Sequence, residues 1–238
     1  MILCIDAGNT RLKWGLHDRS RWLAKGVVAH EGIATLALPA PVQRVVACNV
    51  AGNAVAGQIE ALARSLAAPL EWFVSSAACC GVTNGYGRPE QLGADRWAAL
   101  IGARGLHAGP ALVVMAGTAT TVDALGADGR FLGGLILPGL ELMRRTLARN
   151  TASLPEARGR YQELPTNTDD AIESGALHAT LGAIERMAKA ACRSTSAGFR
   201  VLLSGGAAEA LAPHLDLPLR RIDDLVLEGL SRVAISSS

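Results

Sequence analysis

The sequence predicts an α/β protein built from two similar halves, residues 1–110 and 111–238. Both halves begin with a short apolar run that leads into a glycine-bearing turn and then into further strand-like segments. Helical patterns follow these strands in each half, and no low-complexity tract or long linker interrupts the chain. A repeated order of strands followed by helices is typical of a duplicated α/β unit, and we expect a cleft between the halves.

Three strands open the first half in this prediction. Residues 2–6 form a continuous apolar run typical of a buried strand. In residues 11–17, Leu12, Trp14 and Leu16 alternate with Arg11, Lys13 and Gly15, so a strand places the two sets on opposite faces. We expect a third strand near 22–29 to complete an antiparallel meander. The remaining predicted elements are a buried strand at 44–50, a helix at 53–67, a strand at 71–75 and a helix at 93–105.

The second half repeats this plan. Predicted strands at 111–116, 119–125 and 130–136 are joined by a glycine turn and by the break at 127–129. A helix follows Pro138-Gly139 and reaches about residue 149, and residues 150–167 read as an exposed loop. The longest helical pattern covers residues 169–193, and a strand at 200–204 ends at Ser204-Gly205-Gly206.

Composition and charge restrict the class of protein. Half of the 238 residues are hydrophobic and 18% are charged, which excludes a disordered chain. The net charge of +2 comes from 23 basic and 21 acidic residues without a basic run, so we expect a small-molecule partner and no nucleic acid. No apolar stretch reaches the roughly 18–20 residues of a membrane helix, and the N-terminus lacks a leader pattern, so we expect no membrane association.

Cysteine usage indicates a reducing compartment. The chain has five cysteines, an odd number, and none shows metal-type spacing. We therefore expect reduced thiols in a cytoplasmic protein. Adjacent Cys79 and Cys80 leave metal binding or oxidation open as an alternative.

The first turn, Asp6 to Lys13, has the residue types of a phosphate site. Gly8 allows close approach of backbone N–H groups to phosphate oxygens, and Asn9 and Thr10 offer side-chain donors. Lys13 lies on the polar face of the next strand, within reach of a β- or γ-phosphate. Asp6 ends a buried strand, where its carboxylate can hold Mg²⁺ through water molecules. An ordinary hairpin turn capped by an aspartate is the alternative.

The second turn has a similar donor cluster. Gly117, Thr118, Thr120 and Thr121 bring hydroxyl groups and bare backbone to a strand end, and Asp123 offers a second carboxylate for the metal. A threonine-rich strand explains the same residues without a ligand. The strand that ends in Gly205-Gly206 adds a place where adenine or ribose can lie against backbone. Two such turns facing each other would hold a nucleoside triphosphate, which suggests a phosphotransferase.

These motifs, in this order, resemble the type III pantothenate kinases. The resemblance covers residues 2 to about 206, and Gly93-Ala94-Asp95-Arg96-Trp97 is its most distinctive part. It implies a duplicated ribonuclease-H-like (actin-like ATPase) fold with a nucleotide cleft, and ATP-dependent phosphorylation of pantothenate, the first step towards coenzyme A. It also implies a cytoplasmic homodimer that uses ATP and Mg²⁺.

Residue roles follow from the resemblance by position. Asp95 matches the general base that takes the proton of the pantothenate hydroxyl. The matching pantothenate contacts are Tyr86, Gly93, Ala94, Asp95, Arg96 and Thr168. The matching ATP contacts are Asp6, Ala7, Gly8, Asn9, Thr10, Arg11, Leu12, Lys13 and Thr118, and the expected metal ligands are Asp6 and Asp123.

Elementary chemistry is consistent with the roles of Asp95 and Arg96. A carboxylate in the first turn of a helix is favoured by the helix dipole. In a loose phosphoryl-transfer transition state the proton leaves late, so a weak base mainly orients the hydroxyl oxygen. The planar guanidinium of Arg96 can bind a carboxylate through two hydrogen bonds. A capping pair on a solvated helix start is the alternative for both residues.

One position departs from the family pattern. Many members carry an aspartate two residues before the Gly-Thr of the second turn, where it binds potassium or ammonium, and this chain has Met115. A thioether is a poor ligand for a hard monovalent cation. We therefore expect either weak or absent potassium activation or a cation site built from other groups.

Other readings of the sequence remain open. The apolar face of residues 169–193 fits either a dimer contact or burial within its own half. A kinase of another small alcohol or acid has the same motifs. A nucleotide-binding regulator of the same fold would carry a damaged base or metal site and a DNA-reading module, whereas Asp6, Asp95 and Asp123 are present and no such module is found.

Overall fold

The computed structural model describes residues 1–154, 156, 159–194 and 198–236, which form two compact units. Unit 1 comprises Met1–Ala108, Gly129–Phe131 and Asp224–Ser238, and unit 2 comprises Gly109–Asp128 and Leu132–Asp223. The first change of unit lies close to the predicted boundary at residue 110. The C-terminal segment differs from that prediction, because it returns to unit 1.

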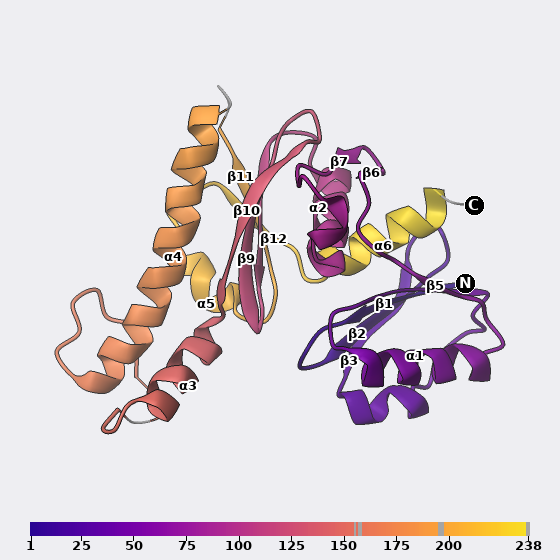
Figure 1. The fold of residues 1–238 in the computed structure, drawn as a ribbon, viewed down its shortest axis with the longest axis horizontal. Helices are drawn as coiled ribbons and strands as arrows, with labels where there is room; N and C mark the ends of the chain where they lie inside the picture. Colours follow the sequence, from indigo (N-terminus) through magenta and orange to yellow (C-terminus); the bar gives the residue numbers. More distant parts are fainter. Residues whose placement is uncertain (155, 157–158, 195–197, 237–238) are drawn as a thin grey trace. The chain divides into compact units, whose positions relative to one another are not determined.

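A five-stranded mixed sheet forms the centre of unit 1 (Figure 1). Its first three strands are an antiparallel meander, as predicted, and the next two run parallel to the first. In sheet order the strands are β3 (Trp22–Val28), β2 (Leu12–His17), β1 (Ile2–Ala7), β4 (Arg44–Asn49) and β5 (Leu70–Trp72). The predicted strand at 71–75 is therefore shorter and begins one residue earlier.

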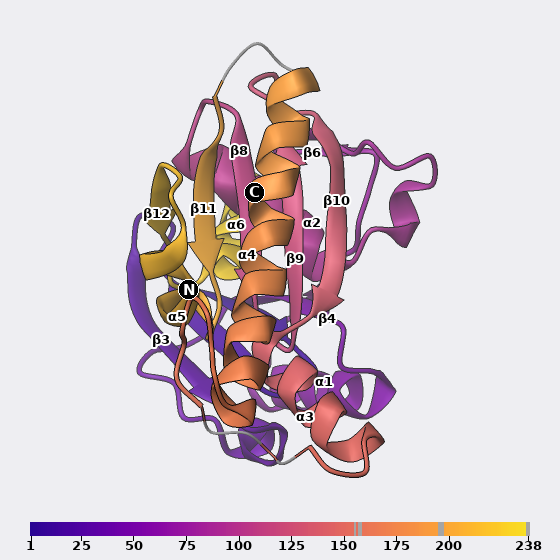
Figure 2. The same cartoon turned by 90° about the vertical axis from the view of Figure 1, so that its left-hand side faces the viewer.

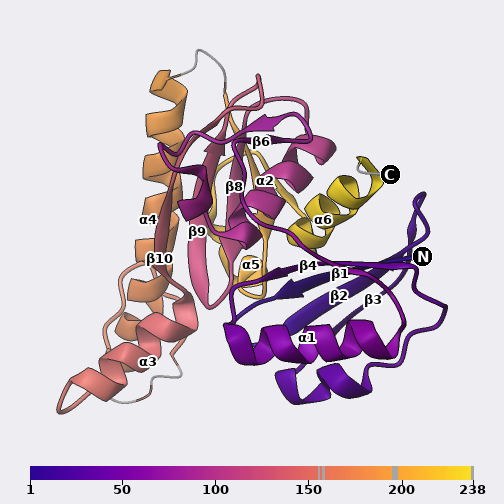
Figure 3. The same ribbon diagram turned by 45° about the vertical axis from the view of Figure 1, so that its right-hand side comes forward.

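Helices cover both faces of this sheet. Helix α1 (Asn53–Ser65) and the 3-10 helix η1 (His30–Thr35) pack on one face over an apolar core (Figure 3). The alternation of side chains along β1 and β2 supplies that core with Leu3, Ile5, Leu12, Trp14 and Leu16. Helix α6 (Leu225–Ser236) contacts β1, β2 and β4 and packs along α2 (Ala94–Leu106).

The contact between α2 and α6 is a close backbone crossing. A Cβ atom on Gly102 would lie 2.4 Å from the carbonyl oxygen of Leu225, and one on Gly229 would lie 1.9 Å from that of Ala98. Both distances are shorter than any real Cβ contact. Glycine at these two positions therefore lets the helices approach, and α6 fixes the position of α2 within unit 1.

A short arm extends from unit 1 between β5 and α2. It consists of the hairpin of β6 (Ala78–Cys79) and β7 (Val82–Thr83), followed by the 3-10 helix η2 (Pro89–Gln91). Thr83 forms a parallel bridge with Arg130, which explains why residues 129–131 group with this unit. The sequence analysis did not predict the hairpin, because each of its strands has only two residues.

The sheet of unit 2 has the same strand order as that of unit 1. Its order is β10 (Phe131–Pro138), β9 (Ala119–Leu125), β8 (Ala111–Ala116), β11 (Arg200–Ser204) and β12 (Leu219–Arg221). β8 pairs with β9 antiparallel and with β11 parallel, and β12 runs parallel to β11. The predicted duplication is therefore present in the topology of the two sheets.

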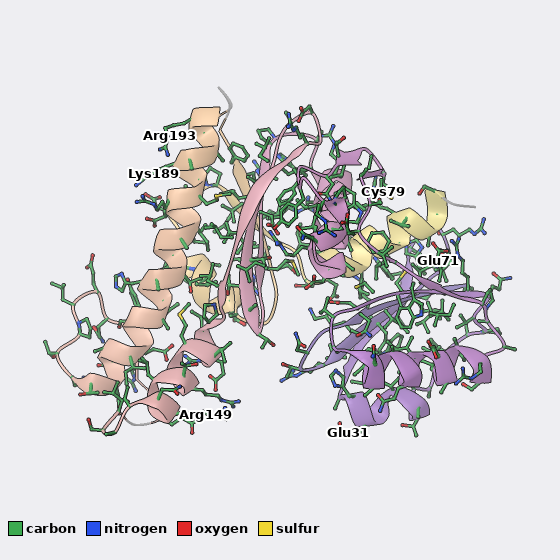
Figure 4. The ribbon with its side chains drawn as sticks, viewed as in Figure 1. Glu31, Glu71, Cys79, Arg149, Lys189 and Arg193 are labelled. Carbon is green, nitrogen blue, oxygen red and sulfur yellow. The ribbon has the colours of Figure 1, made fainter. Side chains whose placement is uncertain are left out.

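The long helix α4 (Thr168–Ser194) crosses one face of this sheet (Figure 2). Its apolar side chains join a core with β8, β9 and β11, and this core includes Ala176, Leu181 and Ile184. Of the two alternatives for this apolar face, burial within its own unit is the one observed. The outward face carries Lys189 and Arg193 (Figure 4). The remaining helices are α3 (Leu140–Asn150), α5 (Ala208–Leu211) and η3 (Ala212–His214).

Of the predicted loop at 150–167, Asn150 is the last residue of α3, the other described residues contain no helix or strand, and positions 155, 157 and 158 lie outside the described residues. All five cysteines are free thiols. In the described part of the chain, no helix is long and apolar enough to cross a membrane.

Candidate active site

The turn between β1 and β2 brings the first predicted motif together. Gly8 N–H donates to the carbonyl oxygen of Arg11 (3.2 Å), which closes the turn, and His30 Nε2 lies 3.0 Å from the Gly8 carbonyl oxygen. Asn9, Thr10 and Arg11 are exposed. The side chains of Ala7 and Leu12 are fully buried in the apolar core. Only their backbone groups can therefore contact a ligand.

Asp6 lies opposite Lys13 in the antiparallel register and opposite Cys48 in the parallel one. The Cys48 thiol donates a hydrogen bond to Asp6 Oδ1 (3.6 Å between sulfur and oxygen). Burial and, next, the charge of Asp95 raise the pKa of Asp6 to about 6, against the opposing effects of Lys13 and the Cys48 hydrogen bond. Two carboxylates that repel each other in this way favour a cation beside them.

Lys13 is held by the residue that precedes α6. Its Nζ lies 3.2 Å from Asp224 Oδ1, and Lys25 Nζ lies 3.6 Å from Asp224 Oδ2. Lys25 also pairs with Glu228 (3.1 Å), whose Oε1 accepts a hydrogen bond from Trp22 Nε1 (2.8 Å). The network joins β2, β3 and α6, and so fixes the Lys13 ammonium beside the glycine turn.

The start of α2 fixes the carboxylate of Asp95. Arg96 N–H donates to Asp95 Oδ1 (2.8 Å), and Trp97 N–H donates to the carbonyl oxygen of Gly93 (2.9 Å) in the first helical turn. A Cβ on Gly93 would lie 2.7 Å from Asp95 Oδ1. A side chain at position 93 would therefore displace the Asp95 carboxylate from this position.

The arm of unit 1 presents Tyr86 to Arg96. Asn84 fixes the arm: its side-chain amide donates to Ser75, Ser76 and Pro89, and its Oδ1 accepts from Tyr86 N–H (3.0 Å). Arg96 donates from a guanidinium nitrogen to the Tyr86 hydroxyl oxygen (3.0 Å). The arrangement joins two predicted substrate contacts from different elements.

Phe131 completes this group and was not predicted from the sequence. Its fully buried ring stacks on that of Tyr86, with 5.6 Å between centroids, and the guanidinium carbon of Arg96 lies 5.9 Å from its centroid. A Cβ on Gly85 would lie 2.0 Å from the Phe131 carbonyl oxygen, so the arm approaches this residue closely. Phe131 therefore holds the ring of Tyr86 from one side.

In unit 2 the predicted glycine turns meet at one end of the sheet. Gly117 N–H donates to the carbonyl of Ala119, and Gly139 N–H donates to that of Thr118 (2.9 Å). Gly205 has a left-handed φ of 103°, and a Cβ there would lie 2.3 Å from the carbonyl oxygen of Ala116. The Gly117-Thr118 turn and the Gly205-Gly206 turn therefore lie beside each other, with exposed Thr118 at the end of the sheet.

Asp123 lies away from this end. It is fully buried in β9 opposite Val113, five residues beyond Thr118, which corresponds to about 16 Å along a strand. This position favours a structural role over metal ligation. The buried hydroxyl oxygens of Thr120 and Thr121 have no hydrogen-bond partner among the described residues.

Thr168 is the first residue of α4 and is exposed. It borders a pocket of about 620 Å³ within unit 2, between the end of β10, α3 and α4. The pocket is mainly apolar, with Met143, Leu147 and Ile172 among its lining residues. No sequence pattern predicted this pocket, because its lining residues come from different elements at irregular spacing.

Comparisons with known proteins agree with these motifs. A family model described as type III pantothenate kinase matches residues 2–190. A type III pantothenate kinase of Aromatoleum aromaticum is 53% identical over 238 residues, covering 98% of both chains. One from Dechloromonas aromatica is 48% identical and covers all of both chains.

Solved structures share the fold at low identity. A putative Baf family transcriptional activator from Campylobacter jejuni has a TM-score of 0.68 and 19% identity, covering 99% of this chain and 98% of that one. A putative 2-dehydro-3-deoxygalactonokinase from Sinorhizobium meliloti has a TM-score of 0.63 and 17% identity, covering 100% and 99%. These likenesses confirm the predicted actin-like, sugar-kinase fold, with its duplicated α/β units.

Proposed function

The chain belongs to the type III pantothenate kinase family, and from that premise we propose how its residues carry out the reaction. The reaction is the ATP-dependent phosphorylation of pantothenate in coenzyme A biosynthesis. The observation that carries the residue assignment is the arrangement of Asp6, Lys13 and Asp95 within unit 1. Asp6 and Lys13 are opposite each other in the strand register, and the pKa of Asp6, which burial raises most, is raised further by the charge of Asp95 and lowered by that of Lys13.

ATP and Mg²⁺ fit the residues at the first turn. Burial and, next, the charge of Asp95 raise the pKa of Asp6, so its ionised carboxylate is unfavourable in the absence of a bound cation. A divalent cation beside Asp6 would supply that charge and neutralise the phosphate oxygens of ATP. We assign this carboxylate to Asp6 and not to Asp123, because Asp123 is fully buried in mid-strand.

The phosphate groups of ATP bind, in this proposal, to the backbone of residues 6–12 and to the Lys13 ammonium. Gly8 N–H lies in a closed turn, and Asp224 holds Lys13 beside it. Thr118, whose hydroxyl group lies at the end of the unit 2 sheet, stays a predicted ATP contact. Fixed donors of this kind stabilise the charge on the transferred phosphoryl group without reorganising during the reaction.

Asp95 acts as the general base. Its carboxylate is fixed by Arg96 N–H and by the bare backbone of Gly93. It accepts a hydrogen bond from the pantothenate hydroxyl, orients that oxygen for in-line attack, and takes the proton late in the reaction. Arg96 and Tyr86 bind the remainder of pantothenate, with the guanidinium directed to its carboxylate, and Thr168 makes a further contact.

Coupled ADP release tests the substrate assignment. We expect turnover with pantothenate and at least a hundredfold lower turnover with simple sugars and acetate at equal concentration. Rapid turnover of another small alcohol or acid, with none on pantothenate, would overturn the assignment. Binding of ATP without turnover of any substrate would favour the alternative of a nucleotide-binding regulator with the same fold.

We also propose a cytoplasmic homodimer that associates through unit 2. Strand β10 lies at the edge of its sheet and carries exposed Leu135 and Ile136, and Leu142 of the adjoining helix α3 is exposed as well. Apolar edge strands favour pairing with another chain. Light scattering should give the mass of a dimer for the native chain and of a monomer for Ile136→Asp. Val74→Asp, at an equally exposed valine of unit 1, is the matched control.

A further inference from the structure

Two adjacent cysteines form a thiol pair outside the proposed kinase site. Cys79 ends β6 and Cys80 begins the turn to β7; Figure 4 labels Cys79 near this hairpin. Successive side chains of a strand point to opposite faces, so neighbouring cysteines do not normally touch. Here Cys80 has a left-handed φ of 48° and Gly81 one of 78°, the pattern of a type I′ turn. This turn brings the two sulfur atoms to 3.6 Å.

The hydrogen atoms of both thiols are directed along one chain of contacts. Cys79 donates to the Cys80 sulfur, and the Cys80 sulfur lies 3.2 Å from Ser236 Oγ. Ser236 in turn donates to the Val233 carbonyl oxygen (3.0 Å). Its hydroxyl hydrogen is thereby committed, so Cys80 is the donor to Ser236. Both thiols are partly exposed, whereas Cys4 and Cys48 are fully buried.

The separation of the sulfur atoms matches a bridged pair. A disulfide requires about 2.0 Å between sulfurs. An atom bonded to two sulfurs at about 2.3 Å with a bent angle holds them roughly 3.5–3.8 Å apart, and a linear bridge holds them about 4.6 Å apart. The observed 3.6 Å corresponds to the bent bridge.

The surrounding residues limit which atom can form that bridge. Zinc needs four ligands, and among the described residues no group of three or more histidine, cysteine or acidic side chains is arranged to hold a metal ion. Trivalent arsenic is pyramidal and is satisfied by two sulfurs and one further substituent. We propose that Cys79 and Cys80 form a capture site for trivalent arsenicals.

The reaction balances without any oxidant. An organic arsenic(III) oxide, R–As=O, forms one As–S bond with each cysteine. The arsenic–oxygen bond breaks, and the oxygen leaves as water with the two thiol protons. Arsenic remains trivalent throughout. Because burial, followed by the neighbouring Cys80, raises the pKa of Cys79 to about 11, reagents that need a single thiolate should react slowly there.

Retention of phenylarsine oxide by the full-length protein tests this proposal. One equivalent is added, a large excess of 2-mercaptoethanol is used to strip adducts held by one thiol, and intact mass is measured under native conditions. We expect the native chain to keep one phenylarsenic group and a dithiol such as dimercaptopropanol to remove it. Two linked thiols bind the phenylarsenic group more tightly than free 2-mercaptoethanol does, so the excess of this monothiol should not remove the group.

Cysteine variants decide between this pair and other thiols. Cys79→Ser and Cys80→Ser should each retain at least about tenfold less phenylarsenic, while Cys192→Ser, at an exposed lone cysteine, should retain as much as the native chain. Circular dichroism confirms that the variants fold. Equal retention by Cys79→Ser and the native chain would overturn the proposal. So would a native chain that captures nothing and instead loses two hydrogens in air, the mark of a disulfide.

Discussion

The charge of Asp95 acts directly on Asp6, although the two residues lie on different elements, β1 and the first turn of α2. Together with burial it raises the pKa of Asp6 from 3.8 to about 6. A carboxyl group shifted in this direction makes the folded protein less stable once it ionises. At neutral pH the ionised Asp6 of the proposed kinase site therefore lowers the stability of the folded protein, and the same negative charge is available to bind a cation.

Asp6→Asn should abolish turnover and stabilise the metal-free protein at pH 8 by about 1–3 kcal/mol. Between about pH 4 and 6, folded Asp6 keeps a proton that the unfolded chain has released, so its unfavourable effect on stability is absent below pH 4, grows as pH rises from 4 to 6 and is complete above 6. Urea unfolding with EDTA at pH 8 and pH 4 measures this. The gain should vanish at pH 4; an equal gain at both values would show that ionisation is not its cause.

Asp95→Asn should lower kcat by about 100-fold or more, because the amide cannot accept the pantothenate proton. ATP affinity should stay within about twofold, as the residue does not contact the phosphates in our proposal. Coupled ADP release and equilibrium binding of a non-hydrolysable ATP analogue measure the two effects. Glu90→Gln, at an exposed acidic residue of the arm, is the control. Normal turnover by the Asp95→Asn variant would show that Asp95 is not the general base.

Asp224→Asn should raise the KM for ATP by about 5–20-fold, because it removes the carboxylate that holds the Lys13 ammonium in place. Partly buried charge-assisted hydrogen bonds are worth about 1.5–3 kcal/mol. The KM for pantothenate should change little. Asp216→Asn removes an exposed aspartate of unit 2 and serves as the matched control. A rise in both KM values by the same factor would indicate a general structural defect.

Phe131→Leu should raise the KM for pantothenate several-fold and leave the KM for ATP unchanged, because the ring that stacks on Tyr86 is lost. The smaller side chain also leaves a cavity that lowers stability by about 1–2 kcal/mol. Phe199→Leu makes the same change at a buried phenylalanine in the core of unit 2. If both variants change the pantothenate KM equally, stability rather than the Tyr86 contact is responsible.

Potassium should activate the enzyme weakly or not at all, because Met115 provides a thioether where a carboxylate would bind the cation. Initial rates with KCl varied against tetramethylammonium chloride at constant ionic strength measure this. Met115→Asp should gain a saturable dependence on potassium. Strong saturable activation of the native chain would mean that other groups build the site.

Part of the geometry of the proposed site follows from local sequence. Gly93 and Asp95 lie two residues apart at a helix start that the sequence predicted, so their closeness follows from one element. The meander of the first three strands followed from the alternation around Trp14, and the repeated glycine turns indicated the duplicated sheets.

Contacts between residues far apart in the sequence have no local sequence pattern that would predict them. Asp224 reaches Lys13 only because α6 returns to unit 1, and Phe131 meets Tyr86 only because a strand of the second half begins beside the arm. Asp123 looked like a ligand in the sequence, but the register of β9 buries it. The glycines at positions 102 and 229, each inside a helix, are the local signs of the helix crossing.

The glycine crossing of α2 and α6 joins the helix that bears Asp95 to a segment far later in the chain. A side chain at Gly102 or Gly229 would meet backbone atoms of the other helix, so it would push the two helices apart and move the start of α2. Residues that touch neither substrate nor nucleotide can therefore set the position of the proposed base.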